Sequence, residues 1–205
     1  MKETVGTETD LAPRLAPPGA GIPFFQKMIL RYFIFPRYSK KMTWETAQDF
    51  FKREGEKILA KARELPAEKI TEKVLVKPMP GLEDSSRYWS VSMAMEHLII
   101  VGSQIAGGIV DLGLGKFPQK KADTATVKPF ENKSAEKIIS EFEAFIKTFL
   151  EKTTRDVVNR EAPQTFAHPW FGPLNAKKWM ALAAIHQQIH RKQIQAIIEG
   201  LSLVH

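Results

Sequence analysis

Apolar side chains recur every three or four residues in four segments of the chain, and charged side chains stand between them. In a helix with 3.6 residues per turn, this spacing gathers the apolar residues on one face. Thr43, Ser90 and Asn175, at the start of three of the segments, are favourable N-cap residues. The pattern therefore predicts four amphipathic helices. They cover residues 43–65, 90–110, 134–153 and 175–200.

Long connections at 66–88, 111–133 and 155–174 separate these helices. Alternation at 74–76 favours a short strand there, for which the sequence identifies no partner. Four helices of this length predict an all-α protein, a four-helix bundle with long crossover connections. Because short loops would have forced antiparallel neighbours and none of these loops is short, the order of the helices stays open.

The second predicted helix is apolar on every side, and Glu96 and His97 are its only ionisable residues before Asp111. A helix of this kind lies at the centre of a protein or at a subunit interface. We therefore expect a homodimer, although the pattern assigns no surface to the contact.

Three histidines lie on the apolar sides of two predicted helices. His186 and His190 are one turn apart, on the stripe of the last helix that also carries Gln193. His97 faces the interior from the second helix. A buried imidazole without a partner costs about 1–3 kcal/mol, so three together favour one shared purpose. They form a candidate set of three nitrogen ligands for a metal ion.

The type of metal site stays open. A catalytic zinc site has three protein ligands and one position for water or substrate, whereas a structural site usually has four protein ligands. His168 or Glu96 would supply the fourth ligand of a structural site. Three imidazoles suit zinc, nickel, copper or iron equally. An empty, degenerate site is the third alternative.

Several other chemistries do not fit the residues. A zincin has Glu directly after the first histidine, where this chain has Gln187. A di-iron bundle has Glu three residues before its histidines, and no such Glu is present. The sequence also lacks a P-loop, a dinucleotide fingerprint and a nucleophile elbow.

The N-terminal part differs from the helices in composition. Residues 1–22 are polar and proline-containing, which predicts a flexible arm. Residues 23–42 are aromatic and basic, and Pro36 is expected to end any short helix there. This segment suits packing over the domain or a subunit contact, with a membrane-surface segment as the alternative. We therefore divide the chain into an arm at 1–42 and a bundle at 43–205.

Composition narrows the classes further. The chain has 205 residues, a net charge of +7 and no cysteine, so disulfides and thiolate metal sites are excluded. Charges of both signs alternate along the helices, which favours a solvated surface over nucleic-acid binding. The N-terminus does not resemble a signal peptide, and the longest apolar run, 98–114, is short for a membrane span. We expect a soluble cytoplasmic protein without a transmembrane segment.

Two segments resemble a known family. RYWSVSMAMEHLIIVG has Trp-Ser at its start and a histidine eight residues after the tryptophan. HPWFGPLNAKKWMALAAIHQQIHRKQI combines a loop, a tryptophan and two histidines four residues apart. Together they are similar to the DinB/YfiT-like superfamily of four-helix bundles, over roughly residues 43–200.

The resemblance implies a divalent metal, zinc, nickel or iron, bound by His97, His186 and His190. Characterised relatives include metal-dependent thiol S-transferases and a mycothiol-dependent isomerase. The resemblance therefore predicts a thiol S-transferase or hydrolase that activates a low-molecular-weight thiol or water toward a small-molecule substrate. A non-enzymatic bundle that binds a metal or ligand is the alternative. The residues expected in the pocket are Glu96, His168, Trp170 and Gln193, and Arg87 and Arg191 are candidate contacts for an anion.

Overall fold

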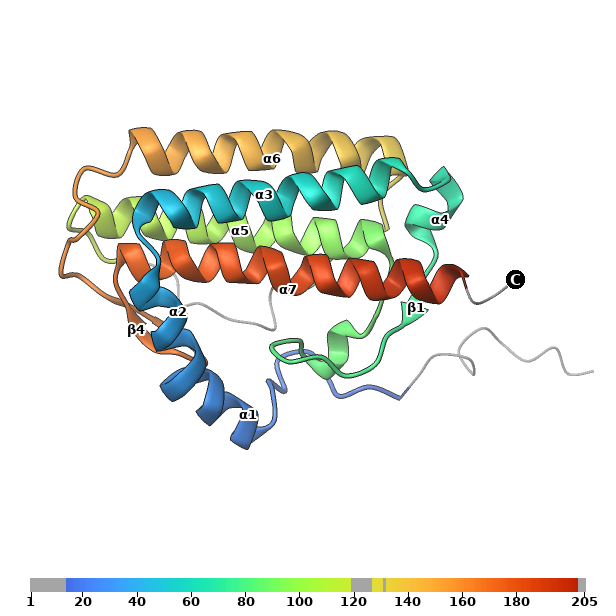
Figure 1. Ribbon diagram of the computed structural model, residues 1–205, viewed down its shortest axis with the longest axis horizontal. Coiled ribbons are helices and arrows are strands. Elements are labelled where there is room, and N and C mark those ends of the chain that lie inside the picture. The colour runs from blue at the N-terminus through green and yellow to red at the C-terminus, as the bar shows by residue number, and fades with distance from the viewer. Residues whose placement is uncertain (1–13, 119–126, 131, 203–205) are drawn as a thin grey trace, which may run out of the picture.

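Four long helices lie side by side in the computed structural model, which describes residues 14–118, 127–130 and 132–202 (Figure 1). The predicted all-α four-helix bundle is confirmed. Each helix ends two or three residues away from its predicted C-terminus, where fraying turns make boundaries least certain. The four are α3 (Trp44–Arg63), α5 (Val91–Gly113), α6 (Ala135–Arg155) and α7 (Ala176–Ser202).

The predicted N-caps are present. Thr43 Oγ1 accepts from the backbone N–H of Thr46 at 3.2 Å, and Thr46 returns the interaction in a capping box. The side chains of Ser90 and Asn175 each accept from the backbone N–H three residues later, at 3.1 Å in both cases. These bonds define where each helix starts, and the start of a helix determines which of its side chains face the interior.

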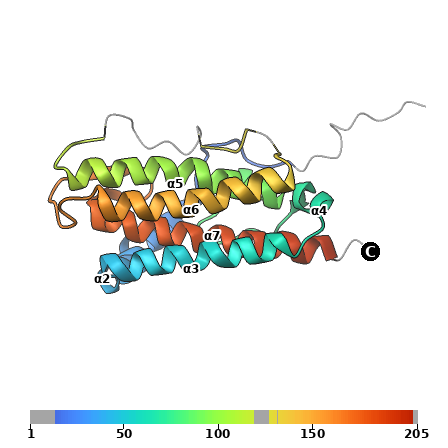
Figure 2. The same ribbon diagram turned by 90° about the horizontal axis from the view of Figure 1, so that it is seen from above.

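The helices form a ring in the order α3, α7, α5, α6, each packing on the next and α6 packing on α3. Helices α3 and α7 run in one direction and α5 and α6 in the other (Figures 1 and 2). The α5–α6 connection therefore has to return along the length of the bundle. This accounts for the long link at 111–133, which the sequence left unexplained.

Aromatic residues join α3 and α6. The rings of Phe51 and Phe149 stack with centroids 4.0 Å apart, and Phe145 meets Phe51 edge-on at 5.9 Å. On the other side of Phe145, Gly102 lets α5 come close, because a Cβ there would lie 2.2 Å from the Phe145 ring. The apolar faces predicted for the first and third helices are confirmed by this packing.

Short elements fill the connections. Helix α4 (Ala67–Thr71) follows α3, and a 3₁₀ turn, η3 (Asp84–Ser86), lies farther along. The strand expected at 74–76 is found as β1 (Val74–Leu75), and its partner is β2 (Tyr88–Trp89), just before α5. A second hairpin, β3 (Phe166–His168) with β4 (Gly172–Leu174), was not predicted from the sequence.

A helical rod precedes the bundle, made of α1 (Phe24–Ile29), a π-helical turn η2 (Leu30–Ile34) and α2 (Phe35–Lys41). The expectation that Pro36 ends a helix was wrong. The wider π turn comes directly before it and relieves the clash that a proline ring makes with the preceding turn. The rod is held on the second hairpin, where the rings of Phe35 and Phe171 stack at 4.7 Å.

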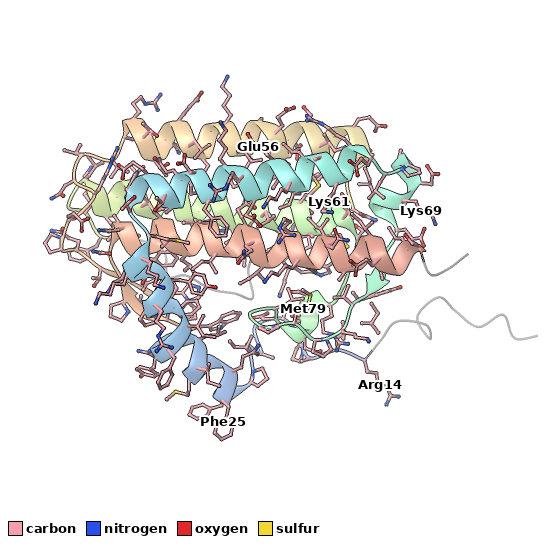
Figure 3. The ribbon with its side chains drawn as sticks, in the orientation of Figure 1. Arg14, Phe25, Glu56, Lys61, Lys69 and Met79 are labelled. Carbon is pink, nitrogen blue, oxygen red and sulfur yellow. The ribbon has the colours of Figure 1, made fainter. Side chains whose placement is uncertain are left out.

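The outer side of this rod is exposed. We expected the aromatic residues of 23–42 to pack over the domain, and within one chain only Phe35 among them is buried. Phe25 projects from the rod away from the bundle (Figure 3). Of the arm expected to be flexible, 1–13 lies outside the described residues. Within 14–22, the backbone N–H of Ala16 donates to Asp84 at 2.7 Å, so this part is attached.

Among the described helices, only α5 is long and apolar enough to be a candidate membrane span, with a mean hydropathy of 1.4. It packs between α6 and α7, and half of its apolar window is buried inside the bundle. This burial is typical of the core helix of a soluble protein.

Candidate metal centre

The three predicted histidines meet where α5 packs on α7. His97 comes from α5, and His186 and His190 come from successive turns of α7. The Nε2 atom of His186 lies 3.3 Å from His97 Nε2 and 3.1 Å from His190 Nε2. Within the described chain, these histidines form a group whose ligand atoms all lie within 4.8 Å of one another.

This spacing fits a shared metal ion. Zinc–nitrogen bonds of about 2.0–2.1 Å with tetrahedral angles place two nitrogens about 3.3–3.4 Å apart. The two measured separations, 3.1 and 3.3 Å, are close to that value. The donor set is all imidazole, which suits zinc, nickel and iron and does not choose among them.

Hydrogen bonds orient two of the rings. His97 Nδ1 lies 2.6 Å from the carbonyl oxygen of Val127, and His190 Nδ1 lies 2.6 Å from Gln193 Oε1. Gln193 Nε2 donates to the Ser86 carbonyl at 2.7 Å, which fixes the amide orientation. Both acceptors can only accept, so each Nδ1 carries the hydrogen and each Nε2 keeps a free lone pair. This arrangement is the usual outer support of metal-binding histidines.

Burial keeps the three imidazoles neutral. It lowers the pKa of His97 and His186 well below the usual value, and the repulsion between protons on adjacent rings, chiefly with His190, lowers both pKa values further. Burial likewise lowers the pKa of His190 to about 4, against the opposing effect of its bond to Gln193. Only a neutral imidazole can ligate a metal, so this environment favours the binding form at neutral pH.

Trp89 closes one side of the group. Its ring lies parallel to the His190 ring at 6.2 Å and tilted against His97 at 5.2 Å. The Lys128 ammonium lies over the same indole, 5.4 Å from the ring centre, and donates to Glu83 and Ser86 at 2.8 Å. This wall keeps water away from the imidazoles on the Trp89 side.

A cavity of about 270 Å³ opens beside the histidines. The rod, the 80–86 loop, the second hairpin and α7 form its walls, so segments from both ends of the sequence enclose it. Most of its lining is apolar. The apolar side chains that line it include Leu30, Ile34, Phe35, Val101, Ile105, Leu182, Ile185 and Ile189.

The other predicted pocket residues divide into two groups. His168 and Trp170 line the cavity, and the backbone N–H of Trp170 donates to His168 Nδ1 at 3.1 Å. Gln193 is fully buried behind His190 and orients that ring instead of facing the cavity. Glu96 does not line the cavity. It is buried and lies 3.4 Å from the Lys133 ammonium.

The cations nearest the cavity were not the expected ones. Arg191 turns away from it and pairs with the buried Glu54 of α3, while Arg87 pairs with Asp84 at 2.7 Å. Lys128 and Lys192 line the cavity in their place. Lys128 lies within the long α5–α6 link, and no periodic pattern could have placed it there.

Among solved structures, the chain is similar to the crystal structure of TT2238, a four-helix bundle protein, with a TM-score of 0.53. The two sequences are 23% identical, and the match covers 75% of this chain and 99% of that chain. No protein-family model matches the chain, and no curated protein matches it. The likeness shows the bundle fold alone, so membership of the DinB/YfiT-like superfamily stays a prediction.

Proposed function

We propose that this protein is a cytoplasmic, divalent-metal-dependent enzyme in which His97, His186 and His190 hold the ion. One observation supports it above the others. The Nε2 atoms of three neutral imidazoles converge at 3.1 and 3.3 Å beside a cavity large enough for a small molecule. A group closed on all sides would instead have favoured a purely structural ion.

A bound divalent ion would lower the pKa of a thiol or water and supply a nucleophile near neutral pH. The chain's own residues would prepare the site for it. Val127 and Gln193 keep the His97 and His190 lone pairs aimed at the centre. Trp89 shields the rings, and the apolar walls exclude water from the space where the substrate would lie.

The lining suggests a class of substrate. Aliphatic and aromatic side chains from the rod and α7 would hold an apolar body. Lys192 lines the same cavity and is exposed to solvent, so it could receive an anionic group at the outer end. A low-molecular-weight thiol would suit the transferase version of the reaction, and water would suit the hydrolase version.

The alternative is a bundle that binds a metal or ligand without catalysis. A structural zinc site usually has four protein ligands, and the described group contains three. The adjoining cavity favours an exchangeable fourth position, and hence the enzyme.

Metal analysis of the purified protein, followed by titration of the stripped protein with Zn²⁺ and Ni²⁺, tests the proposed site. We expect His97→Ala, His186→Ala and His190→Ala each to weaken binding at least tenfold. His168→Ala is the matched control, because His168 is another histidine of the same cavity but lies outside the group. Binding that survives in all three group variants would refute the site.

Activity is tested separately. Thiol-transfer and hydrolysis assays on small apolar electrophiles would be run on the metal-loaded protein, with and without chelator. We expect turnover that chelator abolishes and that His97→Ala lacks. A folded, metal-binding protein without any turnover on the panel would favour the non-enzymatic alternative.

A further inference from the structure

The rod carries an unusual exposed face. Its apolar side chains point away from the bundle along more than two turns, in a part of the molecule that also borders the cavity. Large exposed apolar patches mark interaction sites in soluble proteins. The side chains with the greatest exposure on this face are Phe24 (69%), Phe25 (80%), Ile29 (51%), Tyr32 (54%) and Phe33 (61%).

The charges along the rod have one sign. No Asp or Glu occurs from residue 14 to residue 44, whereas six Lys or Arg residues do. Five of the six belong to the rod itself, and among the described residues none of these five forms an ion pair. These five are Lys27, Arg31, Arg37, Lys40 and Lys41. The exposed ones, Arg37, Lys40 and Lys41, follow the apolar part of the rod directly.

We propose that the rod, residues 24–41, docks the protein on the surface of an anionic lipid bilayer. An interfacial helix combines bulky apolar residues on one face with Lys and Arg, and it lies in the plane of the headgroups. Each cation near an anionic surface adds to the attraction, and Tyr32 can keep its hydroxyl among the headgroups while its ring is buried.

A second copy of the chain fits the same face less well. A two-fold contact would bring the same patch of both copies together. The exposed cations of one rod, Arg37, Lys40 and Lys41, would then come close to those of its partner, without a carboxylate from either rod to offset them. An anionic bilayer supplies the missing negative charge, and for this reason we favour lipid.

Docking would also connect the bilayer with the cavity. The opposite side of the rod contributes Leu30, Ile34, Phe35 and Tyr38 to the cavity wall. The cavity would therefore lie directly behind the docked helix. Substrate entry alone rests on the proposed enzymatic function. If that function holds, an apolar substrate dissolved in the bilayer could enter the cavity without crossing bulk water.

Co-sedimentation of the full-length protein with vesicles tests the docking. We expect binding to vesicles of phosphatidylglycerol mixed with phosphatidylcholine, much weaker binding to phosphatidylcholine alone, and loss of binding at high salt. Phe25→Ser with Phe33→Ser should weaken binding at least tenfold. The matched control is Phe130→Ser, which removes a phenylalanine that is 84% exposed in the loop before α6.

A charge-reversal pair separates the electrostatic contribution. Arg37→Glu with Lys40→Glu should weaken vesicle binding more than tenfold, since each cation contributes about 1 kcal/mol near such a surface. Lys147→Glu with Lys152→Glu makes the same change in net charge on the exposed side of α6 and should have little effect. All these positions are exposed, so the variants should fold, and thermal melting checks this.

Two results would overturn the docking proposal. One is vesicle binding that is absent, or equal in the rod variants and their controls. The other is a dimer in sedimentation that Phe25→Ser with Phe33→Ser dissociates, which would make the face a protein interface. The vesicle assay is repeated after chelation, so its outcome does not depend on whether the metal site or the enzymatic activity exists.

Discussion

Gln193 offers the sharpest test of how the metal centre is built. Its side chain is fully buried, accepts from His190 Nδ1 at 2.6 Å and donates to the Ser86 carbonyl at 2.7 Å. Gln193→Leu keeps the approximate size and leaves both partners unsatisfied. Each buried polar group left unpaired costs about 1–3 kcal/mol. After allowance for the better burial of leucine, we expect a loss of about 2–4 kcal/mol.

Gln193→Leu should lower both the melting temperature and the affinity for the metal. For a protein of this size, 1 kcal/mol corresponds to about 2–4 °C in Tm, so Gln193→Leu should melt roughly 4–16 °C lower. Removal of an outer partner of a metal-binding histidine typically weakens the metal by about 10- to 100-fold. Calorimetry of the stripped protein gives the first quantity, and titration with Zn²⁺ gives the second.

Gln187 provides a matched control on the same helix. It is also buried, at 1% exposure, and neither of its amide atoms has a hydrogen-bond partner among the described residues. Gln187→Leu therefore removes two unsatisfied polar atoms, and we expect equal or higher stability with unchanged metal affinity.

Gln193→Glu separates the two bonds of Gln193. Its carboxylate can accept from His190 but cannot donate to Ser86, so metal affinity should recover more than Tm. Equal behaviour of Gln193→Leu and Gln187→Leu would refute the orienting role of Gln193.

Three further outcomes follow from the structure. Gly102→Ala places a Cβ 2.2 Å from the Phe145 ring and should lower the free energy of unfolding by about 1–3 kcal/mol. A Cβ at Gly107 would meet no atom within 4 Å, so Gly107→Ala should raise the free energy of unfolding by up to about 1 kcal/mol. Thermal melting compares the two variants. Burial, and next the charge of Lys27, lower the pKa of His168 to about 4. Because the usual value of 6.5 applies in the unfolded chain, the unfolded chain takes up a proton on His168 at a higher pH than the folded protein does. The free energy of unfolding therefore falls as the pH drops from 6.5 toward 4, by at most about 1.4 kcal/mol per pH unit from this group. His168→Gln should flatten a plot of Tm against pH in that window. Chelation should lower the Tm of the metal-loaded protein and leave that of His97→Ala unchanged, as melting curves with and without chelator would record.

Helical periodicity was sufficient to predict the four helices of the bundle and the inward orientation of the three histidines. An apolar stripe defines which way each helix faces, and capping residues define where it starts. A single apolar stripe does not account for Gln187, which follows His186 on the helix, lies outside the stripe of His186 and His190, and is nevertheless buried. Helix α7 packs on both α3 and α5, so more than one of its faces is buried, and a single-stripe rule does not describe it.

The surroundings of the histidines could not be predicted in the same way. The carbonyl of Val127, the carbonyl of Ser86 and the ammonium of Lys128 come from irregular segments without any periodic signal. Their positions depend on how the long α5–α6 connection returns along the bundle, and hence on a helix order that the sequence left open. Gln193 was expected in the pocket because it shares a face with His190, but its role depends on Ser86, 107 positions away.

The metal centre and the rod both border the cavity, although they lie on different parts of the chain. The helices would hold the reactive end of a substrate at the histidines, and the rod would determine what reaches it. A bundle with the same histidines but without an apolar rod would expose the cavity to water and would suit hydrophilic substrates. The apolar wall formed by Leu30, Ile34 and Phe35 therefore favours the apolar electrophiles proposed here as substrates. Replacing Ile34 with Ser should reduce turnover of apolar substrates while Zn²⁺ affinity stays unchanged, because the side chain lines the cavity and contributes no ligand atom.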